Sequence, residues 1–159
     1  GGSVGEGGDI SVGYDNWRKA LEHVEETGMR VLVENTAGGK NSVARYMDSI
    51  ERLWEEIGHL NVGLCLDTCH TWAGGIPTID AVKGFKKLVK KIDLIHFNDS
   101  KDGFESSRDR HENLGKGKIP KEELEYVIKN AKTDIIVETP NGLDAQKKDI
   151  AWIRRRLKK

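Results

Sequence analysis

Apolar side chains recur along the chain at two different spacings, which predict alternating helices and strands. Spacing of three and four residues is typical of an amphipathic helix. In the first such stretch Asp15 is placed to cap the helix and Gly28 to end it. The helices predicted in this way cover residues 15–28, 43–57, 77–89 and 120–128, and a last one carries Ile150, Ile153 and Leu157.

Short, nearly continuous apolar runs separate these helices. They lie at residues 30–33, 60–66, 92–97 and 134–137. Such runs are typical of parallel strands that are covered on both faces. Four strands that alternate with helices predict an α/β fold, in which a parallel sheet is built from right-handed βα units. A long polar segment, residues 98–118, follows the third strand.

Length and composition indicate one globular domain. The chain has 159 residues, of which 36% are hydrophobic, enough for a core of ordinary size. Residues 1–8 are rich in glycine and resemble a loop or a cloning remnant, so we assign the domain to residues 9–159. Since no apolar run is long enough for a membrane span or a signal segment, we expect a cytoplasmic protein.

Charge limits the kinds of partner that the whole surface can attract. Lysine and arginine number 26, and aspartate and glutamate also number 26. A net charge of zero gives no overall attraction for nucleic acid, so any such binding must be local. The two cysteines, Cys65 and Cys69, do not form a disulfide framework, and we expect reduced thiols.

Each of the four predicted strands ends in a residue that can bind a metal. These residues are Glu34, Asp67, His96 and Glu138. The carboxyl ends of parallel strands lie at one edge of the sheet, here called the rim, where sites are built. Buried carboxylates cost several kcal/mol unless their charge is neutralised. Each residue alone could cap the next helix or pair with a lysine, but four strand ends together favour a cation site.

The loops after the strands add three more candidate ligands. His70 follows Asp67 by three residues, so a tight turn could direct both into the rim. Asp109 and His111 alternate in an extended segment and should point to one side. Mixed nitrogen and oxygen ligands favour zinc, manganese or iron over calcium.

The sequence predicts less specific roles for the other polar residues and the cysteines. His23 and His59 have no carboxylate partner at a strand end, so we expect both at the surface. Cys65 should pack within its strand, whereas Cys69 either packs or offers a soft ligand. Five residues beside the proposed ligands could orient them or cap the following segments: Asn35, Thr36, Asn98, Asp99 and Thr139.

Basic residues crowd the polar segment that follows the third strand. They are interleaved with glycines and create a local positive field that would suit a phosphate; they are Lys101, Arg108, Arg110, Lys116 and Lys118. A charged loop can also be simply solvated. Trp72 could stack in the gap left by a missing base or could belong to the core.

Five motifs, taken in order, resemble those of a known family. They are Val-Glu-Asn-Thr-Ala-Gly at 33–38, Cys-Leu-Asp-Thr-Cys-His at 65–70, His-Phe-Asn-Asp-Ser-Lys at 96–101, Asp-Arg-His-Glu-Asn-Leu-Gly-Lys-Gly at 109–117 and Glu-Thr-Pro at 138–140. The chain is similar to endonuclease IV, a metal-dependent apurinic/apyrimidinic endonuclease. This resemblance implies a TIM-type barrel with a trinuclear zinc cluster that cuts the phosphodiester 5′ to an abasic site in double-stranded DNA.

The resemblance also implies a role for each candidate residue. Glu34 resembles the carboxylate that bridges two metals. Asp67, His96 and Glu138 resemble the other ligands of one of those metals, and His70, Asp109 and His111 those of the third. We assign catalysis to Glu34 and Glu138. DNA contacts fall to Lys101, Arg108, Arg110 and Trp72.

The chain departs from the family in its length and in its ligand set. A TIM barrel has eight βα units, whereas this chain supplies four and resembles the C-terminal half. Two histidine ligands of the family come from earlier strands and have no counterpart here, because His23 and His59 lie elsewhere. We therefore expect either a homodimer or a separate N-terminal half to close the barrel.

Two other functions fit parts of the sequence. Related xylose isomerase-like barrels also place acidic residues and histidine around a metal, which allows a sugar isomerase or epimerase. The Asp109 and His111 pair with its basic loop suits a phosphate better than a neutral sugar. A catalytically silent half-barrel that binds metal or DNA is the third interpretation, supported by the missing ligands and the zero net charge.

Overall fold

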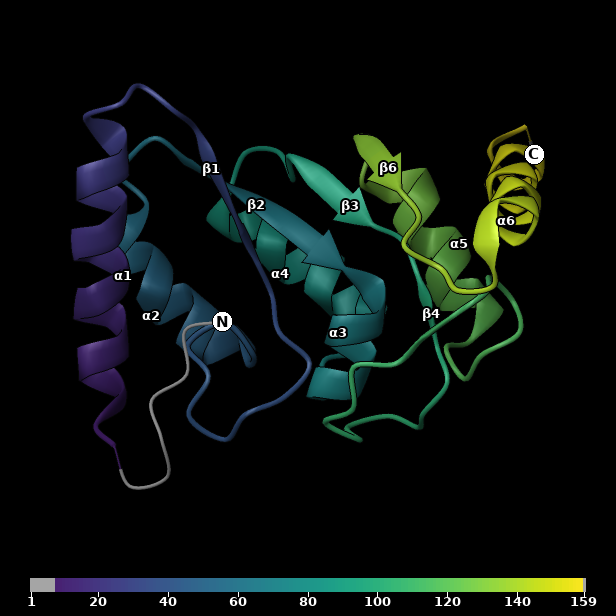
Figure 1. Cartoon of the computed structure of the whole chain (residues 1–159), viewed down its shortest axis with the longest axis horizontal. Coiled ribbons are helices and arrows are strands. Elements are labelled where there is room, and N and C mark those ends of the chain that lie inside the picture. The colour runs from purple at the N-terminus through teal and green to yellow at the C-terminus, as the bar shows by residue number, and fades with distance from the viewer. Residues whose placement is uncertain (1–7, 159) are drawn as a thin grey trace.

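A four-stranded parallel sheet forms the centre of the molecule (Figure 1). The computed structural model describes residues 8–158. The sheet order is β1 (Val31–Glu34), β2 (Val62–Asp67), β3 (Leu94–His96) and β6 (Asp134–Ile136). The predicted α/β class with parallel βα units is confirmed. Residues 1–7 of the predicted glycine-rich segment lie outside the described part.

Helices follow the strands and pack against one another in the same order as the strands. They are α1 (Ile10–Glu25), α2 (Met47–Ile57), α3 (Thr68–Gly74), α4 (Thr78–Leu88), α5 (Lys121–Asn130) and α6 (Gly142–Leu157). Leu64, Leu66 and Ile95 of the sheet share one core with Phe85 of α4 and Leu124 of α5. Residues that alternate with these face the other side of the sheet. Among the described residues, no helix has the length and apolar content to cross a membrane.

Two predicted helix starts are wrong. Helix α1 is capped by Asp9, which accepts a hydrogen bond from the Ser11 amide, while Asp15 lies inside the helix and pairs with Lys19. Helix α2 begins at Met47 rather than Val43. Val43 is fully buried at helical spacing from the helix, but its neighbourhood is irregular because the Thr36 amide donates to the Ala44 carbonyl.

Two short elements on the rim were not expected. Helix α3 follows β2 directly, because Asp67 caps it by accepting the amide of His70. Inside the polar segment 98–118, β4 (Asp99–Ser100) pairs antiparallel with β5 (His111–Glu112). Both elements carry predicted ligands, so they set where those side chains point.

Burial of α2 against β1 provides a test of the fold. Leu53 is fully buried in a cluster with Val33 and Ile57. Leu53→Ala should lower the free energy of unfolding by about 2–5 kcal/mol, because it leaves a cavity. The matched change Leu143→Ala, at a side chain that is 76% exposed, should stay within about 0.5 kcal/mol. Denaturant titrations measure both values, and equal effects would contradict the packing.

Candidate metal centre

The parallel register brings the four predicted strand-end residues together. Asp67 and His96 are direct register partners on β2 and β3. His96 Nδ1 lies 2.9 Å from Glu34 Oε1 and 3.3 Å from Glu138 Oε2. One potential ligand atom from each of Glu34, Asp67, His96 and Glu138 lies within 4.8 Å of all the others. We call these four residues the carboxylate group.

The three loop residues form a second group beside the first. His70 comes from α3, His111 begins β5, and Asp109 lies between β4 and β5. The Asp109 carboxylate oxygens lie 3.1 Å from His70 Nε2 and 3.2 Å from His111 Nε2. These residues also place ligand atoms within 4.8 Å of one another, so Asp109 and His111 point together as predicted. We call them the histidine group.

Both histidines of this group are oriented as metal ligands usually are. His70 Nδ1 lies 2.8 Å from the Asn35 carbonyl oxygen, and His111 Nδ1 lies 3.1 Å from the Glu138 carbonyl oxygen. Each Nδ1 can donate its proton there, which leaves the Nε2 lone pair directed into the site. Both Nε2 atoms are buried and make no hydrogen bond, despite the nearby Asp109 carboxylate. Two buried acceptors without a donor fit a site built for a cation.

The Asp67 carboxylate is fully buried, and each of its two oxygens accepts a hydrogen bond. It accepts hydrogen bonds of 2.8 Å from the His70 amide and from Asn98 Nδ2. The Asn35 side chain bonds both the amide and the carbonyl of Asp67. Asn98 Oδ1 also accepts the Glu138 amide, so one side chain links two ligands. Asn35 and Asn98 therefore orient the site, one of the two roles considered for them.

Burial and charge act in opposite directions on the titrating groups. Burial raises the pKa of Asp67 above its usual value, although His70 and His111 oppose the shift. Burial by itself would lower the pKa of His70, but the carboxylates of Asp67 and Asp109 outweigh it and raise that pKa. The opposite charges of the carboxylates and imidazoles thus offset only part of the cost of burying the Asp67 carboxylate.

Two buried side chains, Asp99 and Arg45, hold the loops of the rim, and no role for Arg45 was predicted from the sequence. Asp99 accepts amide hydrogen bonds from Gly115, Gly117 and Ile119, so it anchors the basic loop rather than a ligand. A Cβ atom at Gly117 would lie 2.3 Å from Asp99 Oδ1, which explains the glycine. Arg45 donates to the Gly74 carbonyl and the Ser107 hydroxyl. Asp99 therefore has the second of the two roles considered for it, capping the segment that follows.

The remaining histidines and the cysteines lie where the sequence predicted. The His23 side chain is 85% exposed beside Glu26, and His59 is exposed. Cys65 and Cys69 are buried free thiols. Burial, more than any neighbouring charge, raises the pKa of each thiol to about 12.

Three of the four predicted DNA-contacting residues contact Asp102. Arg110 Nε donates to Asp102 Oδ2 at 2.7 Å, and Arg108 lies 3.6 Å from the same carboxylate. Trp72 donates its indole proton to the Asp102 carbonyl, and its ring meets the edge of Phe104. Lys101 is exposed. Both arginine side chains are therefore exposed, and the Asp102 carboxylate is the negative partner of both.

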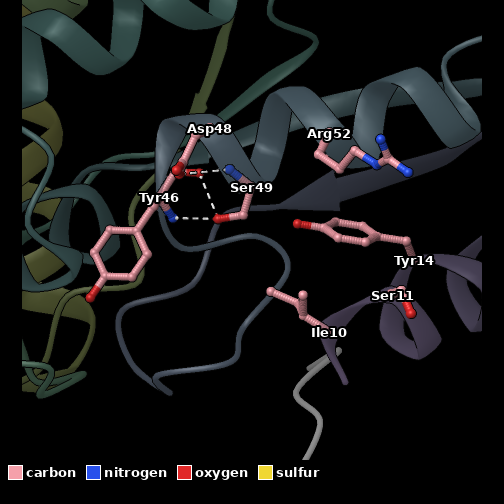
Figure 2. A pocket seen from close by; sticks show the side chains of 7 residues that line it. All are labelled: Ile10, Ser11, Tyr14, Tyr46, Asp48, Ser49 and Arg52. Carbon is pink, nitrogen blue, oxygen red and sulfur yellow. Dashed lines mark hydrogen bonds between the residues drawn. The ribbon is translucent and has the colours of Figure 1, made fainter. Parts of the chain in front are cut away.

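A separate hollow of about 520 Å³ lies between the starts of α1 and α2 (Figure 2). Tyr14, Asp48 and Arg52 are among its lining residues. Burial, followed by the charge of Asp48, raises the pKa of Tyr14. None of the lining residues belongs to either ligand group, so this hollow is separate from the candidate metal centre.

Comparison with known proteins assigns this arrangement to a family. The sequence profile of the xylose isomerase-like TIM barrel family matches residues 4–156. The chain belongs to this family. Within xylose isomerase-like barrels, it is 47% identical over 156 residues to proteins named probable endonuclease 4 from Mycobacterium bovis and Mycobacterium tuberculosis. The relative from Mycobacterium ulcerans is 45% identical over 157 residues.

Solved structures with a similar fold agree with this assignment. Endonuclease IV from Thermus thermophilus has a TM-score of 0.76 at 27% identity, over 95% of this chain and 58% of that one. A D-tagatose 3-epimerase-like protein has a TM-score of 0.71 at 17% identity, over 94% and 54%, which shows the fold alone. The resemblance to endonuclease IV is confirmed. The mycobacterial matches include 98–99% of this chain, but this chain spans only 61% of the length of those relatives.

Proposed function

We propose that this chain is the metal-binding part of a DNA repair endonuclease that hydrolyses the phosphodiester 5′ to an abasic site, with zinc, or manganese in its place, as cofactor. The observation that carries the proposal is the convergence of three histidines and four carboxylates at the rim, where two buried imidazole nitrogens have no hydrogen-bond partner. The endonuclease names of the relatives support the choice of reaction.

The ligand groups suit a phosphodiester substrate. Bound zinc would supply the positive charge that a phosphodiester needs during hydrolysis. The carboxylate group and the histidine group would each hold such an ion, and Asn98 and Asn35 would keep their ligands in place. Without a cation, the carboxylates of Glu34, Asp67 and Glu138 repel one another around one imidazole.

Glu34 and Glu138 are the proposed catalytic residues. Their side chains are 34% and 43% exposed, whereas Asp67 between them is inaccessible. A water molecule can therefore reach either carboxylate, which could accept a proton from it as a general base. Lys101, Arg108 and Arg110 would bind the phosphates that flank the abasic site, and Trp72 would lie beneath them beside the missing base.

We also propose that two copies of this chain close one barrel. Among residues 8–158, no strand pairs with the outer edge of β1 or of β6. Open edges expose unpaired backbone groups, which barrels remove by closure. A groove of about 600 Å³ between β6 and α6, which includes Ile136 and Ile150, lies at one open edge. A two-fold axis would pair β1 of each copy with β6 of the other and give eight strands.

Replacing a ligand histidine should remove bound metal. His96→Ala takes a nitrogen from the carboxylate group, and His111→Ala takes one from the histidine group. Each variant should hold less zinc than the parent by elemental analysis, because the remaining carboxylates no longer complete a ligand set. His23→Ala and His59→Ala are matched controls at exposed sites and should leave the zinc content unchanged. Equal zinc content in all four variants would contradict the metal centre.

The isolated chain should be a weak nuclease. The family's two further histidine ligands have no counterpart here, and loss of one electrostatic element of this kind costs about 100-fold or more in rate. The measurement is incision of a duplex with one abasic-site analogue, compared with a full-length relative. An excess of a fragment that carries the relative's other strands should replace the second copy at β1 and β6 and restore activity. Rapid incision by the chain alone would show that the ligand count is wrong, and no recovery with the fragment would favour a silent metal-binding half-barrel.

If a second copy closes the barrel, the mass of the protein in solution should show it. Light scattering at micromolar concentration should give about twice the mass of one chain. Ile136→Lys places a charge on β6 at a side chain that is 48% exposed, and should give monomers, since charged edge strands resist pairing. Glu122→Lys on α5, away from both edges, is the control and should stay dimeric. A parent protein that stays monomeric would overturn closure by a second copy.

A further inference from the structure

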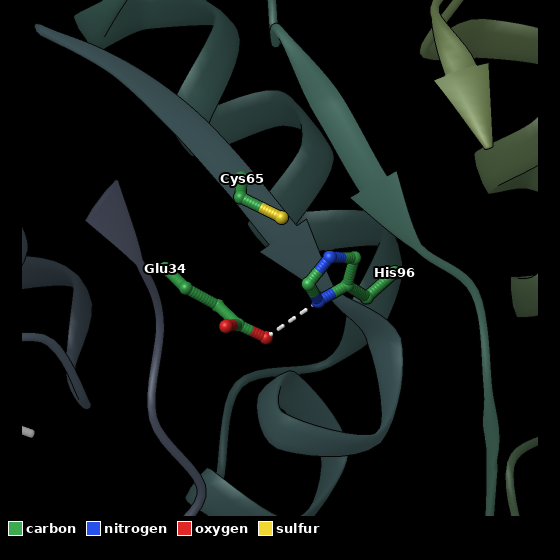
Figure 3. Close-up of side chains that lie close together, drawn as sticks. All are labelled: Glu34, Cys65 and His96. Atoms are coloured by element: carbon green, nitrogen blue, oxygen red, sulfur yellow. Dashed lines mark hydrogen bonds and ion pairs between the residues drawn. The ribbon is translucent and has the colours of Figure 1, made fainter. Parts of the chain in front are cut away.

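The strand register places a thiol beside the Glu34 and His96 contact (Figure 3). Glu34 is the register partner of Cys65, and His96 is the partner of Asp67, two residues further along β2. Register partners, and side chains two apart on a strand, face the same side of a parallel sheet. Cys65 therefore shares the ligand-bearing face and lies one layer below Asp67.

The three side chains approach one another closely enough to share an ion. One ligand atom from each of Glu34, Cys65 and His96 lies within 4.8 Å of the other two. Figure 3 shows the Cys65 sulfur pointing toward the His96 ring, while the Glu34 carboxylate approaches that ring from another side. Around a tetrahedral zinc with bonds of 2.0–2.3 Å, neighbouring ligand atoms are about 3.5 Å apart. Small side-chain rotations would bring the three ligand atoms from these separations to the distances that zinc requires.

We propose that Glu34, Cys65 and His96 form a binding site for a thiophilic divalent cation, which we call the thiolate site. It differs from the carboxylate group by using sulfur in place of Asp67 and Glu138. When the cation binds, the Cys65 thiol gives its proton to solvent and the sulfur binds as thiolate. One thiolate and one carboxylate then balance the two positive charges of the ion, which favours binding where the ligands are half-buried or buried.

The thiolate site and the carboxylate group are alternatives, because one imidazole binds one cation. Sulfur ligands favour softer ions such as zinc and cadmium, whereas carboxylates also accept manganese. The identity of the ion therefore selects the ligand set that binds it. This inference shares Glu34 and His96 with the proposed function, but it does not depend on the nuclease reaction.

Cobalt(II) is a direct probe of the thiolate site. Titration of metal-free protein, kept reduced with a phosphine, should produce a near-ultraviolet sulfur-to-cobalt charge-transfer band, which oxygen and nitrogen ligands do not give. The band should disappear in Cys65→Ser and persist in Cys69→Ser, the matched change at the other buried cysteine. In Cys65→Ser the affinity for cadmium should fall about tenfold or more, while that for manganese stays within about twofold.

The outcomes separate the possibilities. No band in the parent protein, or a band that depends on Cys69 alone, would overturn the thiolate site. If Cys65→Ser does not fold, Cys69→Ser still decides, because Cys65 is then the only thiol and a band in that variant must come from it. Failure of this test leaves the endonuclease proposal standing, since zinc and manganese binding through Asp67 and Glu138 does not involve Cys65.

Discussion

The buried carboxylate of Asp67 is the constraint on which the rest of the site depends. A fully buried acidic group is costly unless hydrogen bonds and opposite charge stabilise it. Asn98 and the His70 amide supply the hydrogen bonds, and in doing so they fix the end of β3 and the start of α3. Asn98 also holds the amide of Glu138. Solvation of one carboxylate by protein groups thus ties three strand ends into one rim.

Strand ends were the predictable part of both the fold and the site. Val31–Glu34 and Asp134–Ile136 are short, yet their apolar runs and the acidic residues that follow them were clear in the sequence. Parallel strands end at one edge, so topology alone placed the ligands together. Asp109 and His111 were predictable as a pair because alternate side chains of an extended segment point to the same side.

Contacts between distant residues were the part that could not be predicted. Val43 continues the apolar period of α2, but a hydrogen bond between Thr36 and Ala44 keeps that stretch irregular. Periodicity reports burial and cannot report such pairing. Helix α3 is too short to show a period, and it begins where it does because Asp67 caps it. The same holds for Asp99, whose three loop amides are 16 to 20 residues away.

In the proposed function, the balance of charges requires the metal centre, rather than the basic loop, to supply most of the attraction for a phosphate. Asp102 already pairs with Arg110 and lies near Arg108, so a phosphate that binds either arginine competes with an existing partner. Arg110 binds both oxygens of this carboxylate, so a phosphate must displace a two-point contact and gains little by the exchange. At the rim, by contrast, four carboxylates surround three imidazoles, and two buried imidazole nitrogens lack a hydrogen-bond partner. A cation bound there would offset the negative charge of these carboxylates, which otherwise repel a phosphate, and would supply an attraction that the paired arginines do not.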